Sequence, residues 1–147
     1  MRWGNLEPEK GRYFVKETWH RPKNGRAVYF DIPKTNSSVS PVELSPTCLQ
    51  ALEDHRVLQR REKLKMGEKY YDKDLIFATA KGGPLHDTNI ASRVYRPALK
   101  QAGIRERRFH DLRHTCASLL IHRRESPKYV QRQLRHSSIE MTFDTYG

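Results

Sequence analysis

Residues 108–120 read RFHDLRHTCASLL. Apolar side chains recur in this stretch at intervals of three and four residues, which is the spacing of one face of an α-helix. These side chains are Phe109, Leu112, Cys116, Leu119 and Leu120. The spacing predicts a helix whose apolar face is buried against a core. His110 and Arg113 are three residues apart, so the helix would place them on one side, with about 5–6 Å between their Cβ atoms.

Two other helices are predicted by the same start signal. Ser45 is an N-cap residue followed by Pro46 at the first helical position, and this pair predicts a helix to about Met66. Its apolar stripe contains Leu49, Leu52 and Leu58. The Ser-Pro pair recurs at residues 126–127 and predicts a short helix through Leu134.

A further helix is predicted between these two. Asp87 or Thr88 is expected to cap its start, and it should run to about Gln101. Gly103 follows, and glycine is the usual residue just past the end of a helix.

The first third of the chain has the composition of strands and turns. Residues 12–16, 27–32 and 38–44 are rich in β-branched and aromatic side chains and predict three strands, with a hairpin turn at residues 34–37. Pro41 lacks an N–H donor and therefore places the third strand at an edge. Together with the helices, this predicts the α+β class: a single, mostly helical domain with a small three-stranded antiparallel sheet near the N-terminus.

The net charge and the number of cysteines narrow the kinds of partner and the cellular location that fit this chain. The chain has 147 residues, with 28 Lys+Arg against 17 Asp+Glu and a formal net charge of +11. This balance favours an anionic partner, nucleic acid more often than a membrane surface. No apolar run is long enough to span a membrane, and the N-terminal MRWGNLEPEK lacks a signal-peptide pattern. Two distant cysteines, Cys48 and Cys116, give no disulfide framework, so a reducing cytoplasmic location is expected.

A zinc hydrolase is one alternative for residues 110–114. His110 and His114 have the i, i+4 spacing with which zincins bind zinc, but Asp111 stands where that pattern has glutamate. A third ligand would be His122 or His136. The plainer alternative is a histidine and an arginine at a solvated helix edge.

Several motifs in a fixed order carry a more specific resemblance. HDLRHTCASLL is followed by SPKYVQRQLRHSSIEMTFDTYG, in which a tyrosine stands ten residues after the histidine of LRHSS. Upstream are RWGNLE, IPKTNSSVSPVEL and DLIFATAKGGPL. In these pieces the chain resembles the catalytic domain of the tyrosine recombinases, the phage integrase family, over essentially all of its length.

The resemblance implies a reaction and the residues that perform it. These enzymes break and rejoin DNA through a 3′-phosphotyrosyl bond, which makes Tyr146 the nucleophile. Because a phenol has a pKa of about 10, its attack needs electrostatic help at the phosphate. Arg113 would bind phosphate oxygens with its fork of donors, His110 and His136 would donate hydrogen bonds or exchange protons, and Lys34 would protonate the departing 5′ oxygen. No metal and no nucleotide cofactor is implied.

Each of these residues also has a plain structural interpretation. Lys34 would be an exposed turn lysine, His136 would cap the final helix, and Tyr146 would be a packed aromatic near the chain end. The corresponding alternative function is a catalytically dead DNA-binding remnant of a prophage integrase.

A basic stretch agrees with double-stranded DNA as the partner. Residues 105–135 hold nine Lys or Arg and three Asp or Glu. The predicted DNA-binding residues are Arg105, Arg107, Arg108, Lys128, Arg132 and Arg135. By resemblance, other recombinase subunits are partners as well, as a tetramer on paired sites, and no membrane is involved.

The resemblance also indicates departures from the family pattern. The family's first active-site arginine lies on a helix upstream of RWGNLE, which here would precede Met1. The 147 residues are therefore expected to be a partial catalytic domain without that helix and without the N-terminal core-binding domain. Their active site is expected to be incomplete, because one catalytic arginine is missing. Arg124 and Arg135 stand where the family commonly has glycine, at positions that call for a left-handed backbone.

Overall fold

The structure, a computed structural model, describes residues 1–20, 29–31, 41–136 and 138–140. Its strands are β1 (Leu6–Glu7), β2 (Arg12–Phe14), β3 (Thr18–His20), β4 (Tyr29–Asp31) and β5 (Pro41–Glu43). Its α-helices are α1 (Pro46–Met66), α2 (Asp87–Ile90), α3 (Arg96–Gln101), α4 (Asp111–His122) and α5 (Pro127–Leu134). Short 3₁₀ segments are η1 (Trp3–Asn5), η2 (Pro8–Lys10) and η4 (Gly67–Lys69), and η5 (Ala91–Tyr95) is a π-helical segment. The predicted α+β class is confirmed.

The sheet has three strands, as predicted, but one of them is not a predicted strand. Its strand order is β1-β2-β5, all antiparallel, while β3 and β4 pair separately. The predicted strand at 27–32 corresponds to β4 and therefore lies outside the three-stranded sheet. The third place is taken by β1, which at two residues is too short to show an alternating pattern. Pro41 does lie on an edge strand, as predicted.

Helix α1 begins and ends as the sequence predicts. The Ser45 side chain accepts a hydrogen bond from the Cys48 N–H at 3.2 Å, Pro46 is the first helical residue, and Gly67 follows the last. The predicted apolar stripe is wrong at Leu58, which is 57% exposed.

The buried face of α1 contains a polar residue in place of that leucine. Gln59 is 4% exposed, accepts a hydrogen bond from Trp3 Nε1 at 2.8 Å, and donates to the carbonyls of Leu75 at 2.9 Å and Ile76 at 3.1 Å. One amide thus satisfies three buried polar groups between the N-terminal segment and residues 75–76. Around it lies the first core cluster, formed by Trp3, Tyr13, Leu52 and Ile76.

The helical region before α4 is continuous and starts one residue earlier than predicted. His86 is the N-cap of α2, although its side chain makes no capping bond, and the chain continues through η5 into α3. Gly103 follows with φ +65°, the left-handed conformation expected at a helix end.

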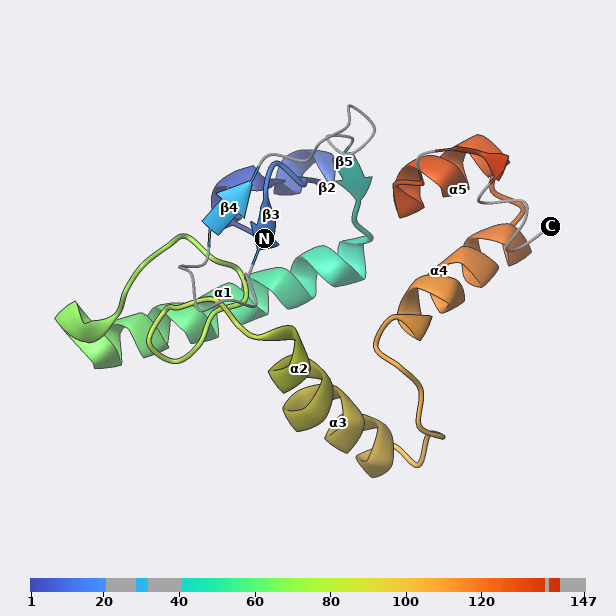
Figure 1. Ribbon diagram of the computed structural model, residues 1–147. Helices are drawn as coiled ribbons and strands as arrows, with labels where there is room; N and C mark the ends of the chain where they lie inside the picture. Colours follow the sequence, from blue (N-terminus) through green and yellow to red (C-terminus); the bar gives the residue numbers. More distant parts are fainter. Residues whose placement is uncertain (21–28, 32–40, 137, 141–147) are drawn as a thin grey trace.

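Helices α4 and α5 form a second, smaller core. Ala117 and Val130 are fully buried, Leu134 is 5% exposed, and Leu120 packs against them. Figure 1 shows these two helices beside one another to the right of α1, with α5 next to β5 and with α2 and α3 projecting below α1.

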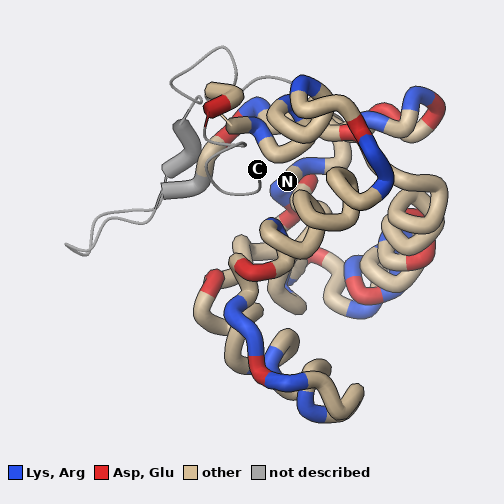
Figure 2. Tube along the Cα trace, turned by 90° about the vertical axis from the view of Figure 1, so that its right-hand side faces the viewer, with Lys and Arg blue, Asp and Glu red and all other residues tan. Residues whose placement is uncertain are grey.

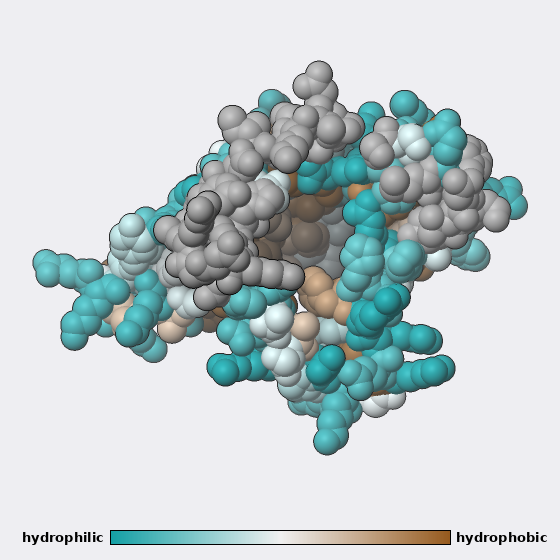
Figure 3. Space-filling model, in the orientation of Figure 1, coloured by the Kyte–Doolittle hydropathy of each residue, from teal (hydrophilic) through white to brown (hydrophobic). Residues whose placement is uncertain are grey.

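The burial predicted for residues 109–119 is wrong. Phe109, Leu112 and Leu119 are 51%, 46% and 55% exposed, and Cys116 is exposed. The face of α4 that meets α5 is displaced by one residue from the predicted stripe. Of the predicted face, Phe109 meets the ring of Tyr95 in η5 edge-on, with 5.3 Å between centroids. Figure 3 shows hydrophobic surface in a recess near the middle of the molecule. None of the described helices is long and apolar enough to cross a membrane.

Candidate active site

The contact between α4 and α5 positions Arg113. Arg113, Ala117 and Leu120 follow one another at i, i+4 and i+7, so they share one face of α4. Because Ala117 and Leu120 pack on α5, this spacing directs Arg113 toward α5 as well. The absence of a large side chain at position 117 lets the two helices approach closely.

Helix α5 ends in a residue with a left-handed backbone. Arg135 has φ 58° and ψ 40°, and its N–H donates to the Arg132 carbonyl at 3.1 Å. The next N–H, that of His136, donates to the Gln131 carbonyl at 3.0 Å. These two bonds define a Schellman motif, in which glycine is the usual residue at the position that Arg135 occupies.

The end of α4 repeats this motif. Arg124 has φ 59°, its N–H donates to the Ile121 carbonyl at 2.8 Å, and the Glu125 N–H donates to the Leu120 carbonyl at 3.1 Å. The sequence-based prediction that both arginines stand at left-handed positions is therefore confirmed.

Arg113, Arg135 and His136 come within electrostatic range of one another, and we call them the helix-end cluster. His136 is 7% exposed, and burial, followed by the charge of Arg113, lowers its pKa. The same two causes, burial first and then Arg113, lower the pKa of Arg135. An imidazole with a lowered pKa is neutral near pH 7, so His136 offers one donor and one acceptor beside two guanidinium groups.

A network around Glu43 fixes α5 against the sheet. Gln133 Oε1 accepts from the Glu43 N–H at 2.9 Å, and its Nε2 donates to the Glu43 carbonyl at 2.6 Å. The side-chain amide therefore bonds the edge of β5 as the backbone of another strand would. The Glu43 carboxylate accepts from Tyr129 Oη at 3.1 Å and pairs with Arg132 at 3.5 Å.

This network was not predicted from the sequence. The available signal was the spacing of Tyr129, Arg132 and Gln133, which places three polar side chains on one face of a helix. Because α5 carries the residues directly before His136, the network holds the helix-end cluster in place relative to the sheet.

His110 lies at the same end of α4 as Arg113. It is the N-cap residue of the helix, is exposed, and its ring meets that of His114 edge-on with 5.7 Å between centroids. Within the described part of the chain, no group of three or more His, Cys, Asp or Glu side chains is arranged to hold a metal ion. Lys34 and Tyr146 lie outside the described residues.

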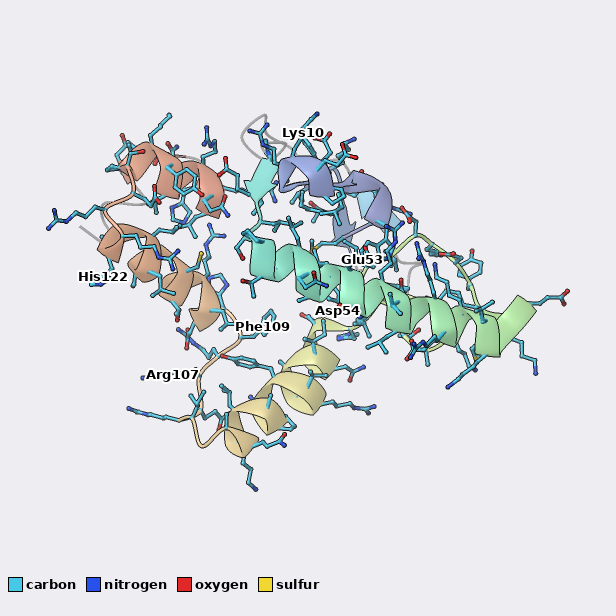
Figure 4. All side chains as sticks on the ribbon, turned by 180° about the vertical axis from the view of Figure 1, so that it is seen from behind. Lys10, Glu53, Asp54, Arg107, Phe109 and His122 are labelled. Atoms are coloured by element: carbon cyan, nitrogen blue, oxygen red, sulfur yellow. The ribbon has the colours of Figure 1, made fainter. Side chains whose placement is uncertain are left out.

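The predicted DNA-binding residues differ in their surroundings. Arg105 and Arg107 are exposed on the connection from α3 to α4, where Figure 4 labels Arg107, and Lys128 is exposed on α5. Arg108 is paired with Asp111 at 3.0 Å, and this contact lowers the pKa of the Asp111 carboxyl. Figure 2 shows Lys and Arg positions distributed along the whole described trace.

The comparison with known families decides the classification. The family model described as the phage integrase family matches residues 1–147. The chain belongs to the phage integrase family.

Curated relatives agree with this membership in the phage integrase family. A tyrosine recombinase XerC-like protein of Caldanaerobacter subterraneus subsp. tengcongensis is 31% identical over 156 residues, which cover 99% of this chain and 40% of the relative. An integrase of Streptomyces ambofaciens is 34% identical over 77% of this chain and 30% of its own length. Prophage integrase IntR of Escherichia coli is 27% identical over 100% of this chain and 38% of its own length. The chain therefore spans 30–40% of the length of these relatives.

Solved structures share the fold. The Tn1549 transposon integrase in complex with transposon right end DNA has a TM-score of 0.78 at 23% identity, covering 100% of this chain and 48% of that one. The XerA recombinase has a TM-score of 0.67 at 21% identity, covering 99% and 44%. The chain thus shares its fold with these two proteins.

Proposed function

We propose that this phage integrase family chain carries out site-specific recombination by cleaving and rejoining DNA strands through a 3′-phosphotyrosyl intermediate. Membership in a family whose relatives include recombinases and integrases supports the reaction class. The observation that carries the proposal is that Arg113, on the face of α4 that packs on α5, lies within electrostatic range of the buried His136 just after α5.

The proposed reaction is balanced within the DNA backbone and the protein. The Tyr146 oxygen forms a bond to phosphorus, the bond from phosphorus to the 5′ oxygen breaks, and the 5′ oxygen takes up a proton from Lys34. The phenolic proton passes to a base, for which a neutral histidine is suited near pH 7. Rejoining reverses these steps, because the phosphotyrosyl ester keeps a bond similar in energy to the one broken.

Arg113 and His136 would act on the phosphate itself. A guanidinium stays protonated and donates to two oxygens at once, so Arg113 can stabilise the negative charge that grows as the tyrosine attacks. A neutral His136 adds one further donor without a second full charge. His110, at the same end of α4, is the remaining proposed donor.

Partners and location belong to the same proposal. Double-stranded DNA is the substrate, other recombinase subunits are expected on paired DNA sites, and the location is cytoplasmic. DNA is present in the solved complex of the Tn1549 integrase, which shares this fold.

The test is a trapped covalent adduct. Nicked duplexes of random sequence allow a short 5′-hydroxyl fragment to diffuse away after cleavage, which leaves a detergent-resistant protein–DNA adduct. Because one catalytic arginine is expected to be missing, the protein should form this adduct slowly. Tyr146→Phe should form none, and Arg113→Gln should slow its formation further, by about 10²–10³-fold. Tyr71→Phe is the matched control, because Tyr71 is an exposed tyrosine outside the site. An adduct in Tyr146→Phe, or DNA binding by the protein without any adduct, would contradict the proposal.

A further inference from the structure

Two arginines of this chain occupy the same unusual backbone position in different surroundings. Arg124 and Arg135 both stand at the left-handed residue of a Schellman motif. Glycine at this position would allow the same two backbone hydrogen bonds without the strain that a Cβ atom causes in a left-handed backbone. Arg124 is exposed, whereas Arg135 is partly buried and directly precedes the buried His136. The two positions can therefore be compared within one molecule.

The surroundings of Arg135 are those of an anion site. Arg113 lies on the face of α4 that packs on α5, Arg135 ends α5, and Arg113 is the charged group that affects both Arg135 and His136. Like charges held in a partly buried place repel one another. An anion between them turns this repulsion into attraction.

The apolar contact beneath the cluster explains why the repulsion does not separate the helices. Ala117 and Val130 are fully buried where α4 meets α5, and the Glu43–Gln133 bonds attach α5 to β5. The two helices are therefore held together, with both guanidinium groups in electrostatic range of each other, before any ligand binds. Such preorganisation strengthens the binding of a ligand of opposite charge.

We infer that Arg135 is a second phosphate-binding arginine of this site, acting with Arg113 and His136 on one phosphodiester group of DNA. A phosphodiester has two non-bridging oxygens, and two guanidinium groups can each donate to them. This inference rests on the proposed function for the identity of the phosphate as the one that is cleaved. The binding of phosphate by the cluster is independent of cleavage.

The first experiment measures phosphate binding without catalysis. Inorganic phosphate is titrated at pH 7 while the ring resonances of His136 are followed by NMR. The unmodified protein should show a saturable shift, and Arg135→Gly should weaken phosphate affinity by roughly ten- to a hundredfold, since one charge-assisted hydrogen-bonding group is lost. Arg135→Lys should fall between the two. Glycine suits the left-handed backbone, so the variant is expected to fold.

Arg124→Gly is the matched control, because it makes the same replacement in the same motif at an exposed position. It should bind phosphate like the unmodified protein. Unchanged phosphate affinity in Arg135→Gly, an equal loss in Arg124→Gly, or the absence of any saturable shift in the unmodified protein would overturn the inference.

A second experiment separates this inference from the proposed function. The rate of adduct formation is compared for Arg135→Gly and Arg124→Gly. A slower rate in Arg135→Gly alone supports the inference, and equal rates with normal phosphate binding refute it while the proposed function stands. If the unmodified protein forms no adduct but Arg135→Gly still loses phosphate affinity, the proposed function fails and the phosphate site remains.

Discussion

A neutral, buried His136 is the residue-scale feature on which the proposed chemistry depends. Its pKa lies below the ordinary value because burial and the Arg113 charge both oppose protonation. Replacing Arg113 with glutamine removes the second cause, so the pKa of His136 should rise in an NMR titration. Arg132→Gln is the control and should leave this pKa unchanged, since Arg132 pairs with Glu43. A His136 that titrates at or above about 6.5 in the unmodified protein would contradict this account.

The same lowered pKa predicts how stability depends on pH. When the pH falls below about 6.5, histidine in the unfolded chain takes up a proton before His136 in the folded chain does. The free energy of unfolding should therefore be largest above this pH. It should decrease as the pH falls from about 6.5 to the lowered pKa of His136 in the folded state. Urea unfolding at several pH values measures the loss, and His136→Gln should make it smaller.

Gln59 is the residue on which the first core most depends. Replacing it with leucine removes the hydrogen bonds that Gln59 makes to Trp3 Nε1 and to the Leu75 carbonyl, whereas the Ile76 carbonyl keeps its bond to His55 Nε2 at 2.6 Å. Each unsatisfied buried group costs about 1–3 kcal/mol, so with two such groups Gln59→Leu should lower the free energy of unfolding by about 2–6 kcal/mol. Gln50→Leu, on the exposed side of the same helix, should change it by less than about 0.5 kcal/mol. Equal effects of the two substitutions in urea unfolding would refute this role.

At the scale of elements, the helix ends are strained where arginine replaces glycine. A left-handed non-glycine residue costs about 1–2 kcal/mol, so Arg124→Gly should raise the free energy of unfolding by about 1 kcal/mol. Arg124→Ala removes the same charge but keeps the Cβ atom, and it should give no such gain. If thermal or urea unfolding shows the same stability for the glycine and alanine variants, the strain at this helix end is not real.

The α4–α5 contact is the element-scale requirement for the helix-end cluster. Ala117 is fully buried there, and a leucine at this position should force the helices apart at a cost of about 1–3 kcal/mol. The matched control is Ser118→Leu, which adds a leucine at the exposed neighbouring position. Beyond the loss in urea unfolding, Ala117→Leu should raise the pKa of His136, because Arg113 moves away. An unchanged pKa would mean that the contact does not position Arg113.

For the whole molecule, the sequence correctly predicts those features that a few neighbouring residues determine. Ser45 and Pro46 predict the start of α1, residues 126–127 predict that of α5, and the resemblance to glycine positions predicts the left-handed backbone at Arg124 and Arg135. Each of these features depends on one helix end and its hydrogen bonds.

Features that depend on distant partners were not predicted. The buried side of α4 could not be chosen from spacing, because a stripe offset by one residue, containing Ala117, packs on α5 while Leu112 and Leu119 are exposed. The polar core residue Gln59 and the Glu43–Gln133 bonds likewise depend on which segments the fold brings together. Strand β1 was missed because two residues show no alternation.

One measurement tests the central claim most directly. The covalent adduct formed on nicked DNA is digested with nuclease and protease, and the modified peptide is sequenced by mass spectrometry. The proposed function predicts a nucleotide joined through phosphate to Tyr146. Attachment to another tyrosine, or the recovery of no modified peptide from protein that binds the DNA, would contradict it.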